Sequence, residues 1–418
     1  MEKRQVGRRW IYLLLGTAAM VFTGFFYAWA ILKMPLSEAF GWTPTELALN
    51  NTLSMFSIAA GNILAGRLEK KISSRLIIVG CAVLIFAGFC ISSVMNDNVL
   101  LLYFSNAFLC GIGIGTFVVT IINIIGKWFE DRNGLSTSML QMGLGFGGML
   151  MGNLTAFLLD TAHVQWRMVY FILGALVGAV LLLTAFVVRE PVKGDWVGIM
   201  KEKGQRTKTV EVRTLEMIRK AEFHHYYMLN LLVGTIGVVM MNFTNDYFSV
   251  LGCGKPMALM MVGCVSVSNG IGRFLIGIIY DWSGRMTALL VTVVSGVGSM
   301  GCLLLSAITG NVEAGVIGAV LAGASYGVIP AAAGPIVRER YGETYFASNY
   351  SVILTTTMPA SVMATVAGAI LTAGGTFTSI YLILFIFSLI SCINYVNLRK
   401  RNGATAGRST GTSPSGVV

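Results

Sequence analysis

The chain has 418 residues, of which 55% are hydrophobic and 12% charged, and its formal net charge is +11. Because a soluble protein normally carries about 25% charged residues, the composition disfavours a soluble protein and favours a membrane protein. A basic excess is also typical of nucleic-acid binding, but the distribution of the basic residues along the chain argues against that function.

Twelve apolar runs follow one another along the chain. Each has about 18 residues or more, which is enough for a helix to cross the roughly 30 Å of hydrocarbon in a bilayer. The sequence therefore predicts an all-α membrane protein with twelve transmembrane helices. The runs cover residues 10–32, 46–66, 76–95, 99–125, 135–159, 167–188, 225–248, 257–280, 287–307, 312–336, 347–373 and 377–397.

The basic residues lie almost entirely on one side of these predicted spans. Of the 30 Lys and Arg residues, 26 fall in the N-terminus, the C-terminal tail and the even-numbered connections. Three fall on the other side, namely Lys33, Arg167 and Lys255, and the remaining one is Arg273. The positive-inside rule then predicts a multi-pass protein of the cell membrane with both termini in the cytoplasm. The charge is explained by topology, so no nucleic-acid partner is expected.

One long polar segment, residues 189–222, separates the first six spans from the last six. It predicts an N-terminal six-helix bundle over 1–188, a cytoplasmic linker, and a C-terminal six-helix bundle over 223–398. The tail from 399 to 418 is rich in Gly, Ser and Thr beyond residue 402 and is expected to be disordered.

Residues that bind metals or carry covalent chemistry are sparse. The seven cysteines form no CxxC or Cys/His cluster and are expected to serve packing, so no metal and no cofactor are predicted. His224 and His225 stand where the seventh span enters the membrane, and a metal or pH role is an alternative to a structural one. With no nucleophile–base pair at membrane depth, an enzyme is not expected.

A short pattern recurs at matching places in the two halves. GIIYDWSGR (277–285) follows the eighth span and AGRLEKKISSR (65–75) follows the second, and each places a carboxylate at a helix end with basic residues after it. The pattern resembles the G-x-x-x-D-[RK]-x-G-[RK] loop of the major facilitator superfamily, although the first copy lacks the inner glycine and has one extra residue. The alternative is ordinary membrane-flanking charge. The resemblance implies conformational gating by Glu69, Lys70, Arg75, Gly277, Asp281, Gly284 and Arg285.

Three further segments resemble the oxalate:formate antiporter branch of this superfamily, which is related to the monocarboxylate transporters. They are residues 8–36, 111–148 and 326–351, and the run KWFEDRNGL within the second is the most specific element. The resemblance covers nearly all the membrane part. It implies two pseudo-symmetric bundles that expose a central site alternately to each side, with a small organic anion as substrate.

Arg273 is the strongest candidate for the site. It lies eight residues before Asp281, so a helical rise of 1.5 Å per residue places it about 12 Å from the cytoplasmic end, near mid-membrane. No carboxylate falls deep in a predicted span, and the nearest, Asp246, lies near the outer end of the seventh. An anionic substrate would complete the site, because the planar donors of guanidinium suit a carboxylate. Neutralisation by carbonyls, hydroxyls and water is the structural alternative.

The resemblance also bears on coupling and on the substrate. Asn269, one turn before Arg273, occupies a position where many proton-coupled carriers have aspartate, which disfavours direct proton coupling through that pair. Oxalate exchangers carry a lysine at the position of Thr357, so one site cation in place of two favours a monoanion over a dianion. Lactate, formate, glycolate or another short 2-oxo or 2-hydroxy acid is the expected class, with oxalate as an alternative.

Other candidates follow by position. Tyr326 and Tyr27 match aromatic positions that line the cavity in the resembled family, and Asn123 and Gln141 are expected to supply neutral donors. Each is alternatively a packing or interhelical hydrogen-bonding residue. The glycines of GIGIG and GLGFGG are interpreted as close helix contacts, and with no Walker lysine motif no nucleotide partner is expected.

The sequence thus predicts a secondary transporter, acting as a monomer, that exchanges small organic anions across a lipid bilayer. A proton-coupled monocarboxylate symporter and a facilitator for neutral or drug-like solutes use the same scaffold and stay open. A non-transporting membrane receptor is the alternative from a different class.

Overall fold

The computed structural model describes residues 2–191 and 211–409, and within these ranges the regular elements are all helical. The first bundle consists of α1 (Glu2–Thr23), η1 (Gly24–Ala28), α2 (Trp29–Leu32), α3 (Met34–Phe40), α4 (Pro44–Leu68), α5 (Ser74–Ser93), α6 (Val99–Leu102), η2 (Tyr103–Cys110), α7 (Gly111–Trp128), α8 (Asn133–Ala156), η3 (Phe157–Thr161) and α9 (Trp166–Val187). The second consists of α10 (Thr214–Arg219), α11 (Ala221–Val250), α12 (Lys255–Thr309), α13 (Val312–Tyr341), α14 (Phe346–Leu354), α15 (Thr357–Thr372) and α16 (Phe377–Ser409).

These elements account for the twelve predicted spans. Among the described residues, ten helical stretches are long and apolar enough to cross a membrane. One of them, within α12, contains two predicted spans, because Gly284 has φ 77° and ψ 175° and breaks the helix there. The twelfth span is α4, which has 25 residues and a less apolar sequence that includes Asn50, Asn51 and Asn62. The prediction of an all-helical membrane protein with twelve spans is confirmed.

Local sequence explains where two of the spans begin or break. α4 begins at a capping box in which the Thr43 side chain accepts from the Glu46 amide and the Glu46 carboxylate accepts from the Thr43 amide, with Pro44 at the first helical position. The eleventh span breaks between α14 and α15, just before Pro359, whose ring and missing N–H disfavour a continuous helix.

Glycines allow the helices of the first bundle to touch. A Cβ at Gly115 of α7 would overlap the Ile58 carbonyl oxygen of α4, and one at Gly143 of α8 would lie 2.5 Å from the Thr17 carbonyl oxygen of α1. Small residues at helix crossings let backbones approach closely in membranes. The interpretation of GIGIG and GLGFGG as helix contacts is confirmed.

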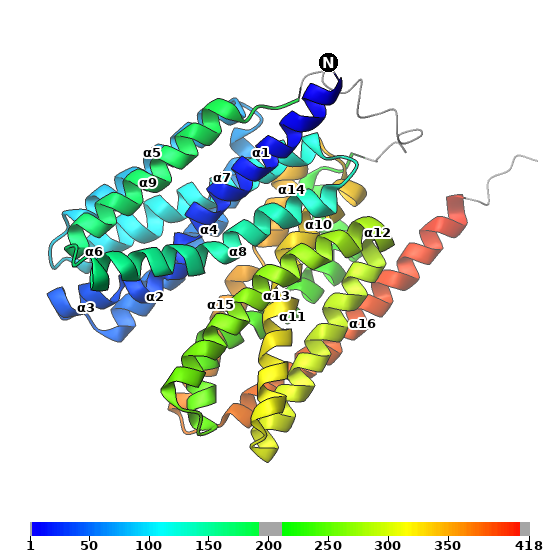
Figure 1. Ribbon diagram of the computed structural model, residues 1–418. Helices are drawn as coiled ribbons and strands as arrows, with labels where there is room; N and C mark the ends of the chain where they lie inside the picture. The colour runs from blue at the N-terminus through cyan, green and yellow to red at the C-terminus, as the bar shows by residue number, and fades with distance from the viewer. Residues whose placement is uncertain (1, 192–210, 410–418) are drawn as a thin grey trace, which may run out of the picture.

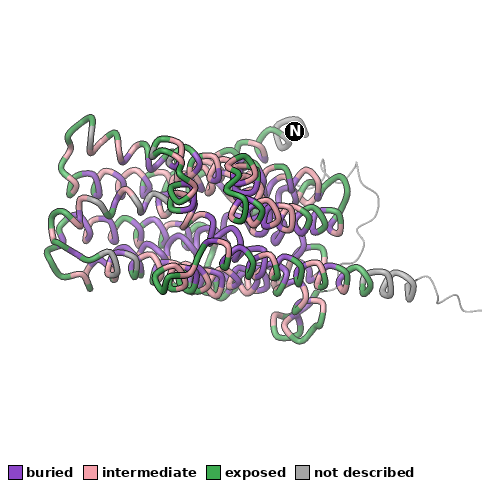
Figure 2. The backbone as a smooth tube through the Cα atoms, turned by 90° about the horizontal axis from the view of Figure 1, so that it is seen from below, coloured by how far each residue is buried: buried purple, intermediate pink, exposed green. Residues whose placement is uncertain are grey.

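The two bundles lie close together at one end of the molecule and splay apart toward the other (Figure 1). The N-terminus and the end of α16 lie at the close end, which is called the terminal side below. Buried residues follow the inward sides of the helices (Figure 2), while large apolar side chains such as Val94, Phe186 and Ile393 are exposed on the outside. Such an apolar surface suits hydrocarbon surroundings.

The connecting segments differ in part from expectation. Within the predicted linker, residues 192–210 lie outside the described ranges, but Glu211 and Val212 are bound to the second bundle. The Glu211 carboxylate accepts from the Thr344 amide at 2.9 Å, and the Val212 amide donates to the Tyr341 carbonyl at 3.0 Å. Residues 399–409, expected in a disordered tail, continue α16 as helix, since extending an existing helix adds one hydrogen bond per residue. Residues 410–418 lie outside the described ranges.

Candidate functional site

A cavity of about 100 Å³ lies between the two bundles. Four of the predicted site residues line it: Gln141 from α8, Arg273 from α12, Tyr326 from α13 and Thr357 from α15. Most of the remaining wall is apolar, with Ile, Leu, Val, Met and Phe side chains. The other polar lining residues are Thr23, Asn62, Asn230 and Thr356.

Arg273 is fixed in this wall by neutral groups. Its side chain is 1% exposed, and its Nε donates to Asn269 Oδ1 at 3.0 Å. Its Nη1 donates to the carbonyl oxygen of Gln141 at 2.8 Å and to Gln141 Oε1 at 3.2 Å. Because Asn269 belongs to the second bundle and Gln141 to the first, the guanidinium joins the two bundles at the cavity.

The charge of Arg273 has no counterpart in the part of the chain that the structure describes. Across residues 2–191 and 211–409, no carboxylate oxygen lies within 4.0 Å of its nitrogens, and its Nη2 forms no hydrogen bond to these residues. A buried cation without a paired anion is unfavourable by several kcal/mol. An anion at Nη2 would remove that cost and gain charge-assisted hydrogen bonds.

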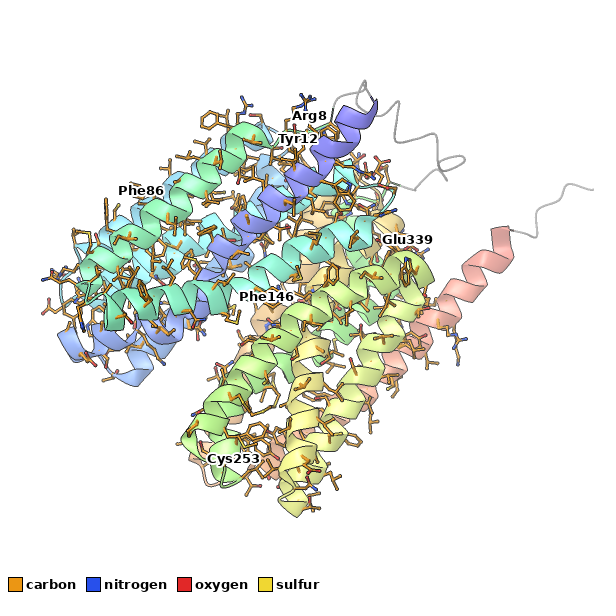
Figure 3. All side chains as sticks on the ribbon, viewed as in Figure 1. Arg8, Tyr12, Phe86, Phe146, Cys253 and Glu339 are labelled. Carbon is orange, nitrogen blue, oxygen red and sulfur yellow. The ribbon has the colours of Figure 1, made fainter. Side chains whose placement is uncertain are left out.

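Glycines create the space in which Arg273 sits. A Cβ at Gly327 of α13 would overlap the Asn269 carbonyl oxygen and lie 3.0 Å from Arg273 Cγ. α8 and α12 cross at Gly145 and Gly270, where a Cβ at Gly145 would be 3.5 Å from the Gly270 Cα. The Phe146 ring covers Gly270, and Figure 3 places Phe146 near the middle of the molecule. Glu339 lies at the terminal side and Cys253 at the opposite end of the second bundle in the same view.

Gln141 extends the contact further into the second bundle. Its Nε2 donates to the hydroxyl of Tyr350 at 2.9 Å, and that hydroxyl lies 3.3 Å from the carbonyl oxygen of Pro330, to which it donates. Tyr350 is fully buried, and its part in this chain of hydrogen bonds was not among the sequence predictions. The sequence shows a tyrosine within a predicted span, but not that its hydroxyl meets Gln141.

The remaining predicted cavity residues are held as follows. Tyr326 packs against Gly237 of α11, where a Cβ would overlap the ring. The Thr357 hydroxyl donates to the Leu354 carbonyl at 2.9 Å, so it presents an acceptor oxygen and no positive charge to the cavity. The side chain of Tyr27 lies outside the described residues, while its neighbour Phe26 lines the cavity.

Asn123 does not line the cavity but belongs to a polar cluster near the terminal end of α7. Its Nδ2 donates to Glu69 Oε2 at 2.6 Å, and its carbonyl oxygen accepts from Arg338 Nη2 at 3.0 Å. Arg338 Nη1 in turn pairs with Glu343 at 3.2 Å. Burial raises the pKa of Glu69 to about 7, although Lys127 and the Asn123 hydrogen bond oppose the increase.

Asp281 connects the bundles directly. Its two carboxylate oxygens accept from the backbone amides of Gly134 and Leu135 at 2.9 and 2.8 Å. These amides open α8, where a carboxylate satisfies unpaired N–H groups and the helix dipole. Gly277 makes the approach close enough, since a Cβ there would lie 2.5 Å from Ser138 Cβ.

The other predicted gating residues have separate partners. Gly284 takes the positive φ that breaks α12, and Arg285 pairs with Glu222 at 3.2 Å, within the second bundle. Lys70 lies 4.8 Å from the ring centre of Tyr345 in the second bundle. Arg75 donates to the Ala185 carbonyl at 3.2 Å, within the first bundle.

Titratable groups relevant to the open alternatives lie away from the cavity. Asp246 is exposed and does not line it, and no described lining residue is Asp, Glu or His. His225 Nδ1 lies 3.0 Å from Asn394 Oδ1, and no metal-ligand group of three His, Cys, Asp or Glu exists among the residues described.

Known proteins of similar sequence and fold agree with this architecture. The model of the Major Facilitator Superfamily matches residues 14–365. The oxalate:formate antiporter of Oxalobacter formigenes is 25% identical over 92% of this chain and 90% of its own length. Human monocarboxylate transporter 2 is 23% identical over 40% of this chain and 35% of its own length.

Two solved structures share the fold at low identity. The proton:xylose symporter XylE, bound to 6-bromo-6-deoxy-D-glucose, has a TM-score of 0.71 and 14% identity over 95% of this chain and 96% of its own. FucP in the outward conformation has a TM-score of 0.69 and 16% identity over 94% and 99%. At these identities the likeness concerns the fold alone.

Proposed function

Because the chain belongs to the major facilitator superfamily and is therefore a membrane transporter, we propose that it carries short organic monocarboxylates by alternating access, in exchange for another anion. The observation that carries the proposal is Arg273, a buried guanidinium beside a central cavity with no carboxylate partner among the described residues. The substrate carboxylate supplies the missing charge and binds Nη2.

Charge in the cavity selects a monoanion. Arg273 is the one charged side chain among the described lining residues, and Thr357 is neutral. A dianion such as oxalate would bring a second carboxylate without a countercharge into a low-dielectric site. The oxalate:formate antiporter relative supports a small carboxylate in general.

The wall of the cavity limits the rest of the substrate. Its volume of about 100 Å³ is below the roughly 300–1,000 Å³ typical of pockets for drug-sized ligands. The mostly apolar lining suits a short hydrocarbon portion next to the carboxylate. These two features favour a small monocarboxylate over a drug-like solute.

The arrangement of the bundles supports a transport cycle. We interpret the structure as the state closed on the terminal side, held by Asp281, Arg338 and their partners. By the positive-inside rule this side is the cytoplasm and the membrane is the cell membrane. An empty cavity leaves the Arg273 charge uncompensated during reorientation, which favours exchange over net leak.

Uptake into proteoliposomes tests the proposal. Radiolabelled lactate, formate and oxalate are offered to the native chain with and without internal carboxylate, next to Arg273→Ala and Arg132→Ala. Arg132 is a matched arginine control, since its side chain is 57% exposed. We expect monocarboxylate uptake that internal carboxylate accelerates, that Arg273→Ala abolishes and that Arg132→Ala preserves.

Other outcomes separate the alternatives. Absence of carboxylate flux in the native chain refutes the proposal and points to neutral or drug-like solutes. Uptake driven by a pH gradient without internal anion identifies a proton symporter. Binding without flux identifies a receptor.

A further inference from the structure

Two amide side chains that line the cavity each have one buried atom that completes no hydrogen bond in the described structure. Asn62 from α4 is 4% exposed, and its Oδ1 accepts no hydrogen bond. Asn230 from α11 is 2% exposed, and its Nδ2 donates none. Both line the cavity that Arg273 lines. An unsatisfied buried polar atom is unfavourable, so two in one ligand-sized cavity indicate groups that a ligand satisfies.

The backbones that carry these amides are firmly placed. The carbonyl of Asn62 accepts from the Ser351 hydroxyl of the other bundle, and the neighbouring Gly61 packs against the Ile112 backbone. Asn230 lies one helical turn from Gly234, which also lines the cavity. Because the helices are fixed and the two amide atoms are unpaired, the arrangement is prepared for a polar group within the cavity.

The chemistry of the two atoms identifies that group. Asn62 Oδ1 needs a donor, and Asn230 Nδ2 needs an acceptor. A hydroxyl is both, since its proton donates and its oxygen accepts. A ketone oxygen only accepts and would leave Asn62 Oδ1 unpaired. An unsubstituted alkyl chain would leave both amides unpaired.

We propose that Asn62 and Asn230 form a second polar subsite that recognises a hydroxyl on the substrate, which makes short hydroxy-monocarboxylates the preferred class. This inference rests on the proposed function, because the carboxylate of the same molecule binds Arg273. The subsite is contributed by α4 and α11, one helix from each bundle, whereas Arg273 and Gln141 come from α12 and α8.

Tyr226 is a polar neighbour of Asn230 on α11. It lies one turn before Asn230, and the Asn230 side chain acts on its hydroxyl as a hydrogen-bonding neighbour, although the two groups do not reach full hydrogen-bond geometry. If Asn230 serves Tyr226 and not a ligand, removing the Tyr226 hydroxyl will reproduce the effect of removing the Asn230 amide. Tyr226→Phe is therefore the matched control.

Binding of matched anions to the purified full chain tests the inference. L-lactate, pyruvate and propionate share a three-carbon skeleton and differ in a hydroxyl, a ketone and no substituent. We expect the native chain to bind lactate about tenfold more tightly than propionate, with pyruvate between them. Asn62→Leu and Asn230→Leu should each remove most of this preference by weakening lactate while leaving propionate binding unchanged or tighter.

The outcomes distinguish this inference from the proposed function. Binding of lactate and propionate with equal affinity by the native chain overturns the hydroxyl subsite and leaves the carboxylate site standing. Loss of the preference in Tyr226→Phe as well overturns the role of Asn230. No binding of any of the three anions overturns both proposals. Retained propionate binding shows that a Leu variant is folded. If a Leu variant does not fold, the comparison of lactate with propionate in the native chain tests the hydroxyl subsite.

Discussion

Arg273 and Arg338 are both buried arginines of the second bundle, and both donate hydrogen bonds to backbone carbonyl groups of the first. They differ in whether a carboxylate of the chain lies beside the guanidinium. Arg338, near the terminal end of α13, has Glu343 at 3.2 Å, whereas Arg273 at the cavity has no carboxylate within 4.0 Å among the described residues. The chain thus completes one charge pair itself and leaves the other for a ligand.

This difference separates a contact that closes the molecule from a site that binds a solute. Arg338 should control how firmly the terminal side is closed and should leave substrate affinity nearly unchanged. Arg273 should control affinity itself.

Arg273→Ala should lower carboxylate binding and uptake by about 100-fold or more, because charge-assisted hydrogen bonds to a carboxylate contribute about 1.5–3 kcal/mol each. Arg273→Lys keeps the charge but loses the planar fork, so an intermediate loss is expected. Equilibrium binding and uptake in proteoliposomes measure both. Normal affinity in Arg273→Ala would mean that the two arginines are alike and structural.

Gly327→Ala and Gly126→Ala place a methyl group against the two arginine sites. At Gly327 the methyl overlaps a backbone carbonyl and crowds Arg273 Cγ, so we expect a cost of about 2 kcal/mol in stability and weakened carboxylate binding. At Gly126 the methyl meets the buried guanidinium of Arg338, so we expect a loosened terminal contact and an unchanged carboxylate affinity.

Thermal unfolding and binding assays on both glycine variants test this contrast. Gly263→Ala is the control, because a Cβ there meets nothing within 4 Å. Equal loss of affinity in Gly327→Ala and Gly126→Ala would remove the distinction between the two sites.

Arg338→Ala should slow exchange about tenfold while changing the dissociation constant less than threefold. The variant leaves Glu343 and the Asn123 carbonyl without their buried partner, which destabilises the closed terminal side. Spin labels at the exposed positions Leu76 and Leu215 should report a longer distance between the bundles. A large loss of affinity with an unchanged distance would contradict the assignment.

The pH dependence of the terminal side should follow Glu69. Its pKa is raised from 4.5 to about 7 by burial, so the closed state binds a proton more readily than a state in which Glu69 meets water. The closed state therefore gains stability as pH falls from about 7 toward 4.5 and loses it as pH rises through 7. We expect the ratio of closed to open molecules at pH 5.5 to exceed that at pH 8 by about tenfold or more.

The same spin-label distance, recorded from pH 5 to 8, measures this shift. Lys127, Glu190 and Arg338 are charged groups that interact with Glu69, so Glu69→Gln should flatten the profile while all three remain. A profile that survives in Glu69→Gln would assign the titration to another group.

Much of the architecture could be predicted because it depends on local sequence. The lengths of the apolar runs predicted twelve spans, and the one long polar segment predicted their division into two bundles. The separation of eight residues between Arg273 and Asp281 predicted that Arg273 lies near mid-membrane. The same count of residues from a helix end would have placed Asn123 away from the cavity. It lies five residues before Trp128, where α7 ends, which places it about 7.5 Å from that end and away from mid-membrane.

Contacts between distant helices could not be predicted in the same way. Gln141 meets Tyr350 and Arg273 only because α8, α12 and α14 present particular faces to one another, and one sequence does not fix those rotations. The unpaired amides of Asn62 and Asn230 were missed for the same reason. Whether a mid-span asparagine is satisfied depends on neighbours from other helices.

The hydrogen bonds from Arg273 to Gln141 have a consequence for measured affinities. Gln141 acts as an internal competitor, because a carboxylate that takes Nη1 as well as Nη2 must displace an acceptor already in place. The observed dissociation constant is then a difference between two sets of bonds, and it should be weaker than the contacts alone suggest. Substrate binding and the contact between the bundles use the same donor, Arg273 Nη1. A carrier built in this way binds its substrate less tightly and releases it more readily.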